Sequence, residues 1–170
     1  MKQEYFALCI TRTCGSGGTE IGKMLAQQLG IDLYDRKLLR LASEDSGINE
    51  KIFAKADQDT KKTLLYKVSK SVYNGELIPP ESGNFLSDRN LFEYQAKVLK
   101  ELLKKESYVV LGRAADFVLR DKPNAISIFL SASEEACFAR ETEIMQTDAF
   151  GVNRHINSIN RYRSDYYRYH

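Results

Sequence analysis

The chain has 170 residues, of which 43% are hydrophobic and 28% are charged, and its formal net charge at pH 7 is +2. This length and composition predict one globular domain with a substantial buried core. So small a net charge gives no support to nucleic acid or a membrane surface as the partner. No apolar run approaches the roughly 18 residues of a membrane span. We therefore expect a cytoplasmic protein that binds neither nucleic acid nor membrane.

A glycine-rich segment stands between the first two expected elements. It reads Arg12-Thr13-Cys14-Gly15-Ser16-Gly17-Gly18-Thr19, after a strand pattern over 5–10 and before a helical pattern over 19–29. Glycines let a backbone approach a ligand closely, and the first N–H groups of a helix favour anions. The segment is a candidate phosphate loop. Its spacing is weak support, because the G-x-x-x-x-G-K-[ST] pattern has lysine where this chain has Gly18. A simple strand–helix turn is the alternative.

The rest of the chain alternates helical and extended patterns. In the first half we expect a C-cap at Gly30, a strand over 31–35, helices over 36–43, 48–57 and 60–73, and an exposed loop over 74–87. In the second half we expect a helix over 91–103, a buried strand over 108–111 and a strand over 125–130. A helix that begins with a capping-box pattern at 131–134 follows, and a last helix runs from about 152 to 170. Such alternation predicts an α/β domain with a mainly parallel sheet.

The three cysteines are odd in number and lack zinc-binding spacing. We expect Cys9 and Cys137 to be small buried hydrophobic residues. Cys14 lies in the glycine-rich segment, where a helix N-terminus is able to lower the pKa of a thiol. Neither His155 nor His170 has a sequence context that marks it as a base for Cys14. We therefore expect no zinc site, and we do not favour a catalytic cysteine.

Polar residues follow each predicted strand. They are Gly15 to Thr19 after the first strand, Asp35 and Arg36 after the second, Gly112, Arg113 and Asp116 after the third, and Ser131 to Ser133 after the fourth. Ligands of open parallel sheets bind beyond the carboxyl ends of the strands. A structural role for any one of these residues, such as an Arg–Asp pair, is the alternative. Their convergence on one edge favours a functional site.

Four ordered segments carry a family resemblance. They are Gly15-Ser16-Gly17-Gly18, Leu33-Tyr34-Asp35-Arg36, the run from Val110 to Asp116, and Arg163-x-x-Tyr166-Tyr167. In this set and order the sequence resembles the cytidylate-kinase-like family of P-loop nucleoside monophosphate kinases. The family commonly carries G-S-G-G in place of the lysine-bearing motif. The resemblance covers nearly the whole chain.

The resemblance implies one P-loop NTPase-type α/β domain of three layers over 1–170. Its parts would be a five-stranded parallel sheet, a helical monophosphate-binding segment over 36–107, and an arginine-bearing lid over about 140–155. Relatives usually continue past the equivalent of Tyr167 into a final strand, whereas this sequence stops at His170. We therefore expect either a truncated sequence or a sheet without its last edge strand.

The resemblance also implies residue roles. The donor phosphates of ATP would be held by Gly15, Ser16, Gly17, Gly18 and Thr19, and the hydroxyl of Thr19 would bind Mg²⁺. The acceptor nucleotide would face Asp35, Arg36, Arg113 and Asp116. In classical kinases the missing lysine bridges the donor phosphates. Its positive charge would have to come from Arg12, Lys23, Arg113, Arg140 or Arg163, of which Arg140 and Arg163 match arginines that reach the transferring phosphates.

These residues favour phosphoryl transfer from ATP·Mg²⁺ to a nucleoside monophosphate, with CMP or dCMP as the first acceptors to consider. Two alternatives stay open. A nucleotide-binding regulatory or interaction module would keep the fold without efficient transfer, and the missing lysine supports that reading. A kinase of another small metabolite is the other, because a fold does not determine its acceptor. The sequence indicates neither the acceptor base and sugar nor the oligomeric state.

Overall fold

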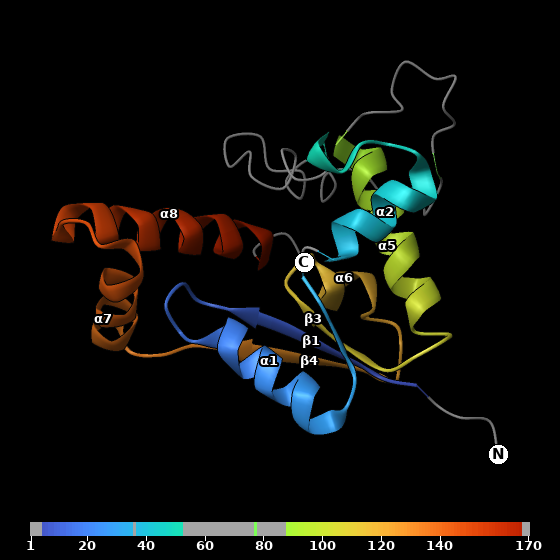
Figure 1. Cartoon of the computed structure of the whole chain (residues 1–170), viewed down its shortest axis with the longest axis horizontal. Helices are drawn as coiled ribbons and strands as arrows, with labels where there is room; N and C mark the ends of the chain where they lie inside the picture. Colours follow the sequence, from blue (N-terminus) through green and yellow to red (C-terminus); the bar gives the residue numbers. More distant parts are fainter. Residues whose placement is uncertain (1–4, 36, 53–76, 78–87, 168–170) are drawn as a thin grey trace.

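A four-stranded parallel sheet forms the centre of the molecule (Figure 1). The computed structural model describes residues 5–35, 37–52, 77 and 88–167. The strands are β1 (Ala7–Arg12), β2 (Asp32–Tyr34), β3 (Tyr108–Leu111) and β4 (Ala125–Leu130). They lie in the order β2-β3-β1-β4, and each neighbouring pair is parallel. The predicted α/β domain with a parallel sheet is confirmed. The resemblance implied five strands, whereas the described residues form four.

Six helices are defined in the described part of the chain. They are α1 (Gly18–Leu29), α2 (Lys37–Ser46), α5 (Asp88–Leu102), α6 (Ala115–Val118), α7 (Glu134–Met145) and α8 (Ala149–Tyr167). Gly30 caps α1 at φ +63°, as expected. The short helix α6 was not predicted. None of the helices in these residues combines the length and apolar character that a bilayer crossing requires.

Two helix starts differ from the sequence expectation. The N-cap of α7 is Ser133, whose hydroxyl accepts a hydrogen bond from the backbone N–H of Ala136 (3.2 Å). Alanine stands where a capping box needs Glu or Gln, so the reciprocal bond expected from 131–134 is absent there. The last helix starts at Ala149 rather than near 152, because Asp148 Oδ1 accepts from the N–H of Gly151 (2.7 Å) and caps it.

Several expectations lie outside the described residues. They concern Arg36, the helix over 60–73 and all but residue 77 of the loop over 74–87. The helix expected over 48–57 is described only to residue 52, and residues 50–52 are helical.

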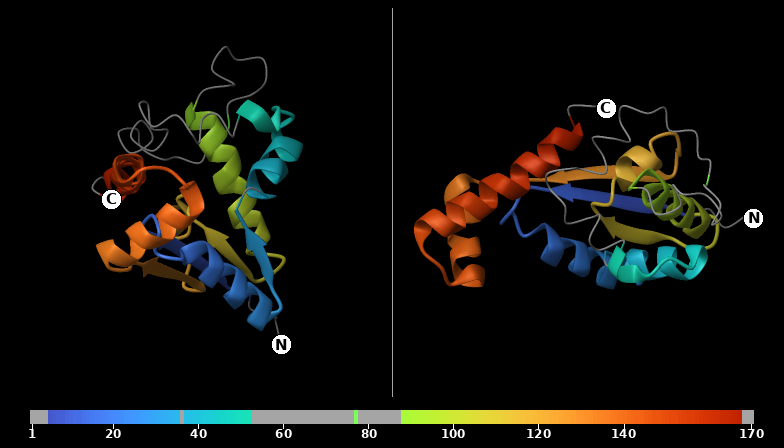
Figure 2. Two further views of the ribbon diagram at one scale, coloured as in Figure 1. Left: turned by 60° about the vertical axis from the view of Figure 1, so that its left-hand side comes forward. Right: turned by 90° about the horizontal axis from the view of Figure 1, so that it is seen from above.

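The two faces of β1 belong to two different cores. Ala7 and Cys9 pack with residues of α2, α5 and α6, whereas Leu8 and Ile10 pack with residues of α1. Successive side chains of a strand point to opposite faces, so these helices form layers on the two sides of the sheet (Figure 2). Residues 7–10 are all buried, as is typical of a central parallel strand.

The last two helices lie apart from the helices that cover the two faces of the sheet. α7 and α8 pack on each other beyond the carboxyl ends of the strands, and α8 runs back toward α6 (Figures 1 and 2). The parallel arrangement places the segments that follow β1, β3 and β4 at this same edge. The sheet therefore directs the candidate residues of distant segments to one end of the molecule.

Candidate functional site

The glycine-rich segment joins β1 to α1 by a turn that requires glycine. Gly15 (φ +75°) and Gly17 (φ +78°) have left-handed backbone conformations that other residues rarely adopt. A Cβ at Gly15 would also lie 2.5 Å from the carbonyl oxygen of Cys137 in α7. The hydroxyl of Ser16 donates to the carbonyl of Thr13 (2.9 Å) and closes the turn. The segment therefore lies directly against the backbone of α7.

The N-terminus of α1 is open toward the edge of the sheet. Its N-cap is Gly17, which has no side chain to accept a hydrogen bond, and the first helical bond runs from the N–H of Ile21 to the Gly17 carbonyl (3.0 Å). The N–H groups of residues 17–20 precede that bond, so they have no partner within the helix. Thr19 lies in this first turn. Unpaired N–H groups at the positive end of a helix dipole suit a phosphate.

Two arginine side chains lie against the loop glycines. A Cβ at Gly17 would be 3.2 Å from the guanidinium carbon of Arg140. A Cβ at Gly18 would be 2.8 Å from the Cβ of Arg12, and one at Gly112 would be 3.1 Å from the Arg12 Nη1. The side chain of Arg12 thus extends from the start of α1 to the end of β3. Glycine therefore leaves space for the guanidinium group of Arg140 at Gly17. It leaves space for the aliphatic stem of Arg12 at Gly18 and for the guanidinium group of Arg12 at Gly112.

A third arginine is fixed to the same strand end. Arg163 Nη1 of α8 donates to the backbone carbonyl of Arg12 (2.7 Å). Arg140 Nη1 lies 3.8 Å from Glu20 Oε2, and their side chains are 48% and 56% exposed. Exposed ion pairs of this kind stabilise by about 0–1 kcal/mol. If Arg140 leaves Glu20 to bind an anion, the loss of this ion pair would therefore cost little free energy.

The end of β3 holds a second group of charged residues. Arg113 Nη2 lies 3.5 Å from Asp35 Oδ1 at the end of β2, and the Arg113 side chain is only 8% exposed. Gly112, Arg113 and Ala114 have φ values of +68°, +60° and +55°. A non-glycine residue in this region costs about 1–3 kcal/mol, and such strain concentrates at functional sites. The backbone is thus held in an unfavourable form that directs Arg113 toward Asp35.

Asp116 lies in the first turn of α6, on the other side of β1 from α1. Burial, followed by the nearby charge of Asp116, raises the pKa of the Cys9 thiol to about 12. The charge of Asp116 therefore acts on the thiol of Cys9 in β1. Arg36, which was expected to accompany Asp35, lies outside the described residues.

The surroundings of Cys14 raise the pKa of its thiol, although its place near a helix N-terminus is of the kind that is able to lower it. Its side chain is buried, with 6% of its surface exposed. Burial first, and the neighbouring Glu141 second, raise the pKa of the thiol to about 11. Desolvation and a carboxylate together outweigh any lowering by the helix N-terminus. Cys9 and Cys137 are buried, as predicted.

Sequence analysis missed three contributors to this region: Glu20, Asn160 and the pair of Glu141 with His155. Asn160 Oδ1 accepts from the backbone N–H of Cys14 (2.7 Å) and joins α8 to the loop. His155 Nε2 lies 3.8 Å from Glu141 Oε2. No spacing rule signals these contacts, because they join residues that are far apart in the sequence. Only Glu20 had a local signal, as an acidic residue in the first turn of a helix.

The fold and the site together define a class of protein: a parallel α/β domain with a glycine-rich loop and an uncapped helix N-terminus at the carboxyl edge of its sheet. The model of the Cytidylate kinase-like family matches residues 7–170. A cytidylate kinase of Fervidobacterium nodosum is 30% identical over 161 residues, covering 86% of this chain and 72% of that enzyme. The chain therefore belongs to the cytidylate kinase-like family, and this membership indicates nucleotide kinase activity.

A solved structure shares the fold. The crystal structure of an uncharacterized protein from Eubacterium ventriosum matches with a TM-score of 0.65 at 22% identity, covering 97% of this chain and 77% of that one. At this identity the likeness concerns the fold alone. It extends over nearly the whole chain, including the α7–α8 region.

Proposed function

We propose that the protein transfers the γ-phosphoryl group of ATP·Mg²⁺ to a nucleoside monophosphate, with CMP or dCMP as the preferred acceptor. The observation that carries the proposal is the meeting of an uncapped helix N-terminus with two arginines at the glycines of the loop. Phosphoryl transfer requires positioning and charge neutralisation rather than a covalent protein nucleophile. Family membership points to the same chemistry.

The donor phosphates would bind at the start of α1. The start of α1 suits them, because Gly17 leaves the first N–H groups of the helix without a side-chain cap. The N–H groups of the first turn would donate to phosphate oxygens, Ser16 would keep the turn closed through Thr13, and the hydroxyl of Thr19 would be the protein ligand of Mg²⁺. The metal would neutralise charge that develops on the donor phosphates.

Arginines would replace the absent lysine. The guanidinium group of Arg140 already packs on Gly17, so it needs little movement to reach a bound phosphate. The aliphatic stem of Arg12 packs on Gly18, and its guanidinium group, which now lies at Gly112, would turn toward the phosphate. Arg163 would act at the same place, since it is tied to the backbone of Arg12. Several guanidinium groups at one anion site supply the charge stabilisation that a single lysine gives in other kinases.

The acceptor would bind beyond β2 and β3. Arg113 would contact its phosphate, while Asp35, Arg36 and Asp116 would contribute polar contacts next to the substrate-binding segment 36–107. Arg113 is held by Asp35 and by its strained backbone, so it is oriented before the acceptor arrives. Closure of residues 140–155 would bring Arg140 over the phosphates and exclude water from the transfer.

The proposal is tested by isothermal titration with ATP·Mg²⁺ and with CMP, followed by a coupled assay for ADP. An acceptor panel of CMP, dCMP, UMP, AMP and small alcohols separates a cytidylate kinase from a kinase of another metabolite. We expect both nucleotides to bind and CMP or dCMP to give the highest kcat/KM. The absence of both binding heat and ADP would overturn the proposal.

Two variants address the arginines. Arg140→Ala is expected to lower kcat by about 10²–10³-fold, the range seen when one charge-stabilising donor is removed. Arg161→Ala removes an exposed arginine of α8 outside residues 140–155 and is the matched control, with unchanged kcat. Equal activity of the wild type and Arg140→Ala would remove Arg140 from the mechanism.

A second candidate, a nucleotide-binding regulatory module, is favoured by the glycine at the lysine position. It predicts binding of ATP or CMP without ADP formation under any acceptor in the panel. The same titration and assay therefore distinguish the two candidates.

A further inference from the structure

Three side chains with metal-binding atoms meet between the glycine-rich loop and the last two helices. They are Cys14 of the loop, Glu141 of α7 and His155 of α8, and one ligand atom of each lies within 4.8 Å of the others. Cys14 is 6% exposed, and the side chains of Glu141 and His155 are 12% and 41% exposed. The group is thus buried on two sides and open to solvent at the histidine.

This cluster lacks a complete explanation as ordinary packing. Glu141 is one of the buried charged residues in the described part of the chain, and a buried carboxylate is costly unless it is compensated. It faces the Cys14 thiol and, at 3.8 Å, the His155 ring. The backbone of Cys14 is held in place by Asn160. The three ligand atoms are therefore positioned by contacts from three separate segments.

We propose that Cys14, Glu141 and His155 bind a divalent transition-metal ion, with Zn²⁺ as the expected ion and a water molecule as the fourth ligand. Zinc accepts thiolate, imidazole and carboxylate ligands at about 2.0–2.3 Å, which places tetrahedral ligand atoms about 3.3–3.8 Å apart. The 3.8 Å between His155 and Glu141 already meets this spacing. The remaining pairs need to close by about 1 Å at most.

The donor set separates this site from the metal of the proposed phosphoryl transfer. Mg²⁺ prefers six oxygen ligands and retains several waters, whereas sulfur and imidazole nitrogen favour Zn²⁺ and related ions. The proposed Mg²⁺ position is the hydroxyl of Thr19 in α1. The two sites therefore differ in residues and in ligand chemistry, and either one can fail without the other.

Binding would replace the thiol proton of Cys14. The sulfur–hydrogen bond breaks, a sulfur–metal bond forms, and the proton passes to solvent, while neutral His155 and ionised Glu141 bind without further change. The ion would join the glycine-rich loop to α7 and α8 at one point. It would thereby limit the movement of residues 140–155 relative to the loop.

Titration of the nucleotide-free protein with Co²⁺ tests the site, because a cobalt–thiolate bond gives a charge-transfer absorption in the near ultraviolet. We expect this band to saturate at one equivalent, to be displaced by Zn²⁺, which binds more tightly than Co²⁺, and to be unaffected by Mg²⁺. Zn²⁺ is also expected to raise the Tm of the wild type. A folded wild type without the band at millimolar Co²⁺ would overturn the proposal.

Variants assign the ligands. Cys14→Ser is expected to abolish the band, and His155→Ala to weaken Co²⁺ binding by at least about 10-fold and to cancel the Tm rise. The matched controls are Cys9→Ala, a buried thiol outside the cluster, and Glu143→Gln, an exposed carboxylate of α7. Both should retain the band. Far-ultraviolet circular dichroism checks that each variant is folded.

If Cys14→Ser does not fold, the result for His155→Ala decides, because the His155 side chain is 41% exposed and its removal leaves no buried cavity. Unchanged Co²⁺ affinity in His155→Ala would overturn the proposal. So would a thiolate band that persists in folded Cys14→Ser, since the bound thiol would then be another cysteine.

Discussion

Single residues of the loop illustrate how a glycine can be required for two independent reasons. Gly30 has a left-handed backbone but open space around it, whereas Gly15 has a left-handed backbone and a carbonyl group in the position of a Cβ. Gly30 is required for its backbone conformation alone, whereas Gly15 is required both for its conformation and because a side chain would clash. Both follow from the backbone, and neither depends on a ligand.

The two glycines give a matched test. Gly30→Ala is expected to lower the free energy of unfolding by about 1–2 kcal/mol, the cost of a left-handed alanine. Gly15→Ala should cost clearly more, because its Cβ would displace the backbone of α7 at Cys137. Urea unfolding of both variants measures the difference. Equal losses would contradict the close approach of the loop to α7.

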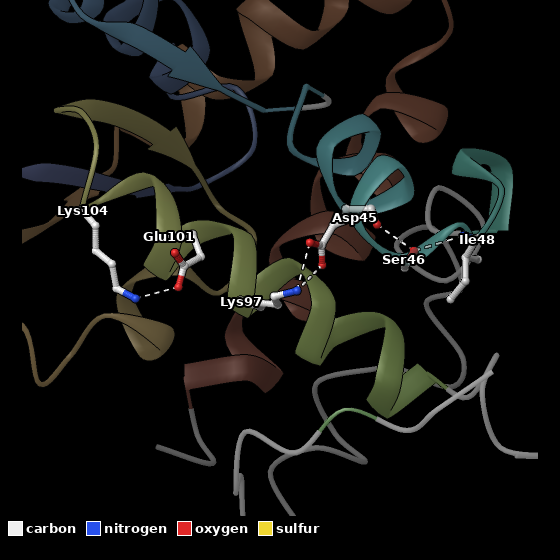
Figure 3. A network of polar contacts seen from close by, with 7 residues as sticks. Asp45, Ser46, Ile48, Lys97, Glu101 and Lys104 are labelled. Atoms are coloured by element: carbon white, nitrogen blue, oxygen red, sulfur yellow. Dashed lines mark hydrogen bonds and ion pairs between the residues drawn. The ribbon is translucent and has the colours of Figure 1, made fainter. Parts of the chain in front are cut away.

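At the scale of elements, α5 packs through its apolar side, and its outer side carries exposed ion pairs. Leu99 is fully buried, and its carbonyl accepts a hydrogen bond from the hydroxyl of Tyr108 (2.8 Å). On the exposed side, Lys97 Nζ pairs with Asp45 of α2 at 2.8 Å (Figure 3). Ser46 ends α2 by bonding both Ala42 and Ile48. We expect the buried contacts to dominate the packing of α5.

Two variants on α5 separate these contributions. Leu99→Ala is expected to lower the free energy of unfolding by about 2–5 kcal/mol, because it removes buried methyl groups and leaves a cavity. Lys97→Ala should cost less than about 1 kcal/mol, because the paired side chains of Lys97 and Asp45 are 44% and 32% exposed. Urea unfolding compares them. A larger loss for Lys97→Ala would show that α2 and α5 depend on their surface charges.

The elements also explain why the candidate site is assembled from distant segments. Arg12 ends β1, Arg113 follows β3, and Arg140 and Arg163 belong to α7 and α8. The parallel sheet sends the first two to one edge, and the two helices return over that edge. A change in the angle between α7 and α8 would therefore move Arg140 relative to Arg163.

At the scale of the whole molecule, weakly acidic groups buried in one core of the sheet and in the glycine-rich loop make stability depend on alkaline pH. Burial raises the pKa of Cys14 to about 11 and of Cys9 to about 12, and it raises the pKa values of Tyr34 and Tyr108 as well. In the unfolded chain these groups ionise at ordinary values, so the unfolded state loses protons first as the pH rises.

Stability should therefore be constant with respect to these groups below about pH 8 and fall above about pH 9. Each thiol contributes up to about 1.4 kcal/mol per pH unit between its unfolded and folded pKa. Urea midpoints from pH 7 to pH 10.5 measure the slope. Cys9→Ala should have a shallower slope than the wild type. A pH-independent free energy of unfolding would contradict the burial of these groups.

The sequence by itself determined the order of elements, the parallel α/β class and the family. These depend on local patterns: the apolar run over 108–111, the helical periodicity before Gly30, and ordered motifs such as Gly15 to Gly18. Local patterning reports how a segment buries its own side chains, so it predicted β3 and α1 well. It missed α6, a single turn too short for a periodic signal.

Only the tertiary structure decided which side chains meet. The packing of Arg12 on Gly18 and Gly112, the pairing of Arg113 with Asp35, and the cluster around Cys14 join residues from separate elements. The pKa of Cys14 was not predictable from its place in the loop, because it depends on burial and on Glu141, which comes from α7. Distances and desolvation belong to the folded molecule, and no spacing along the chain contains them.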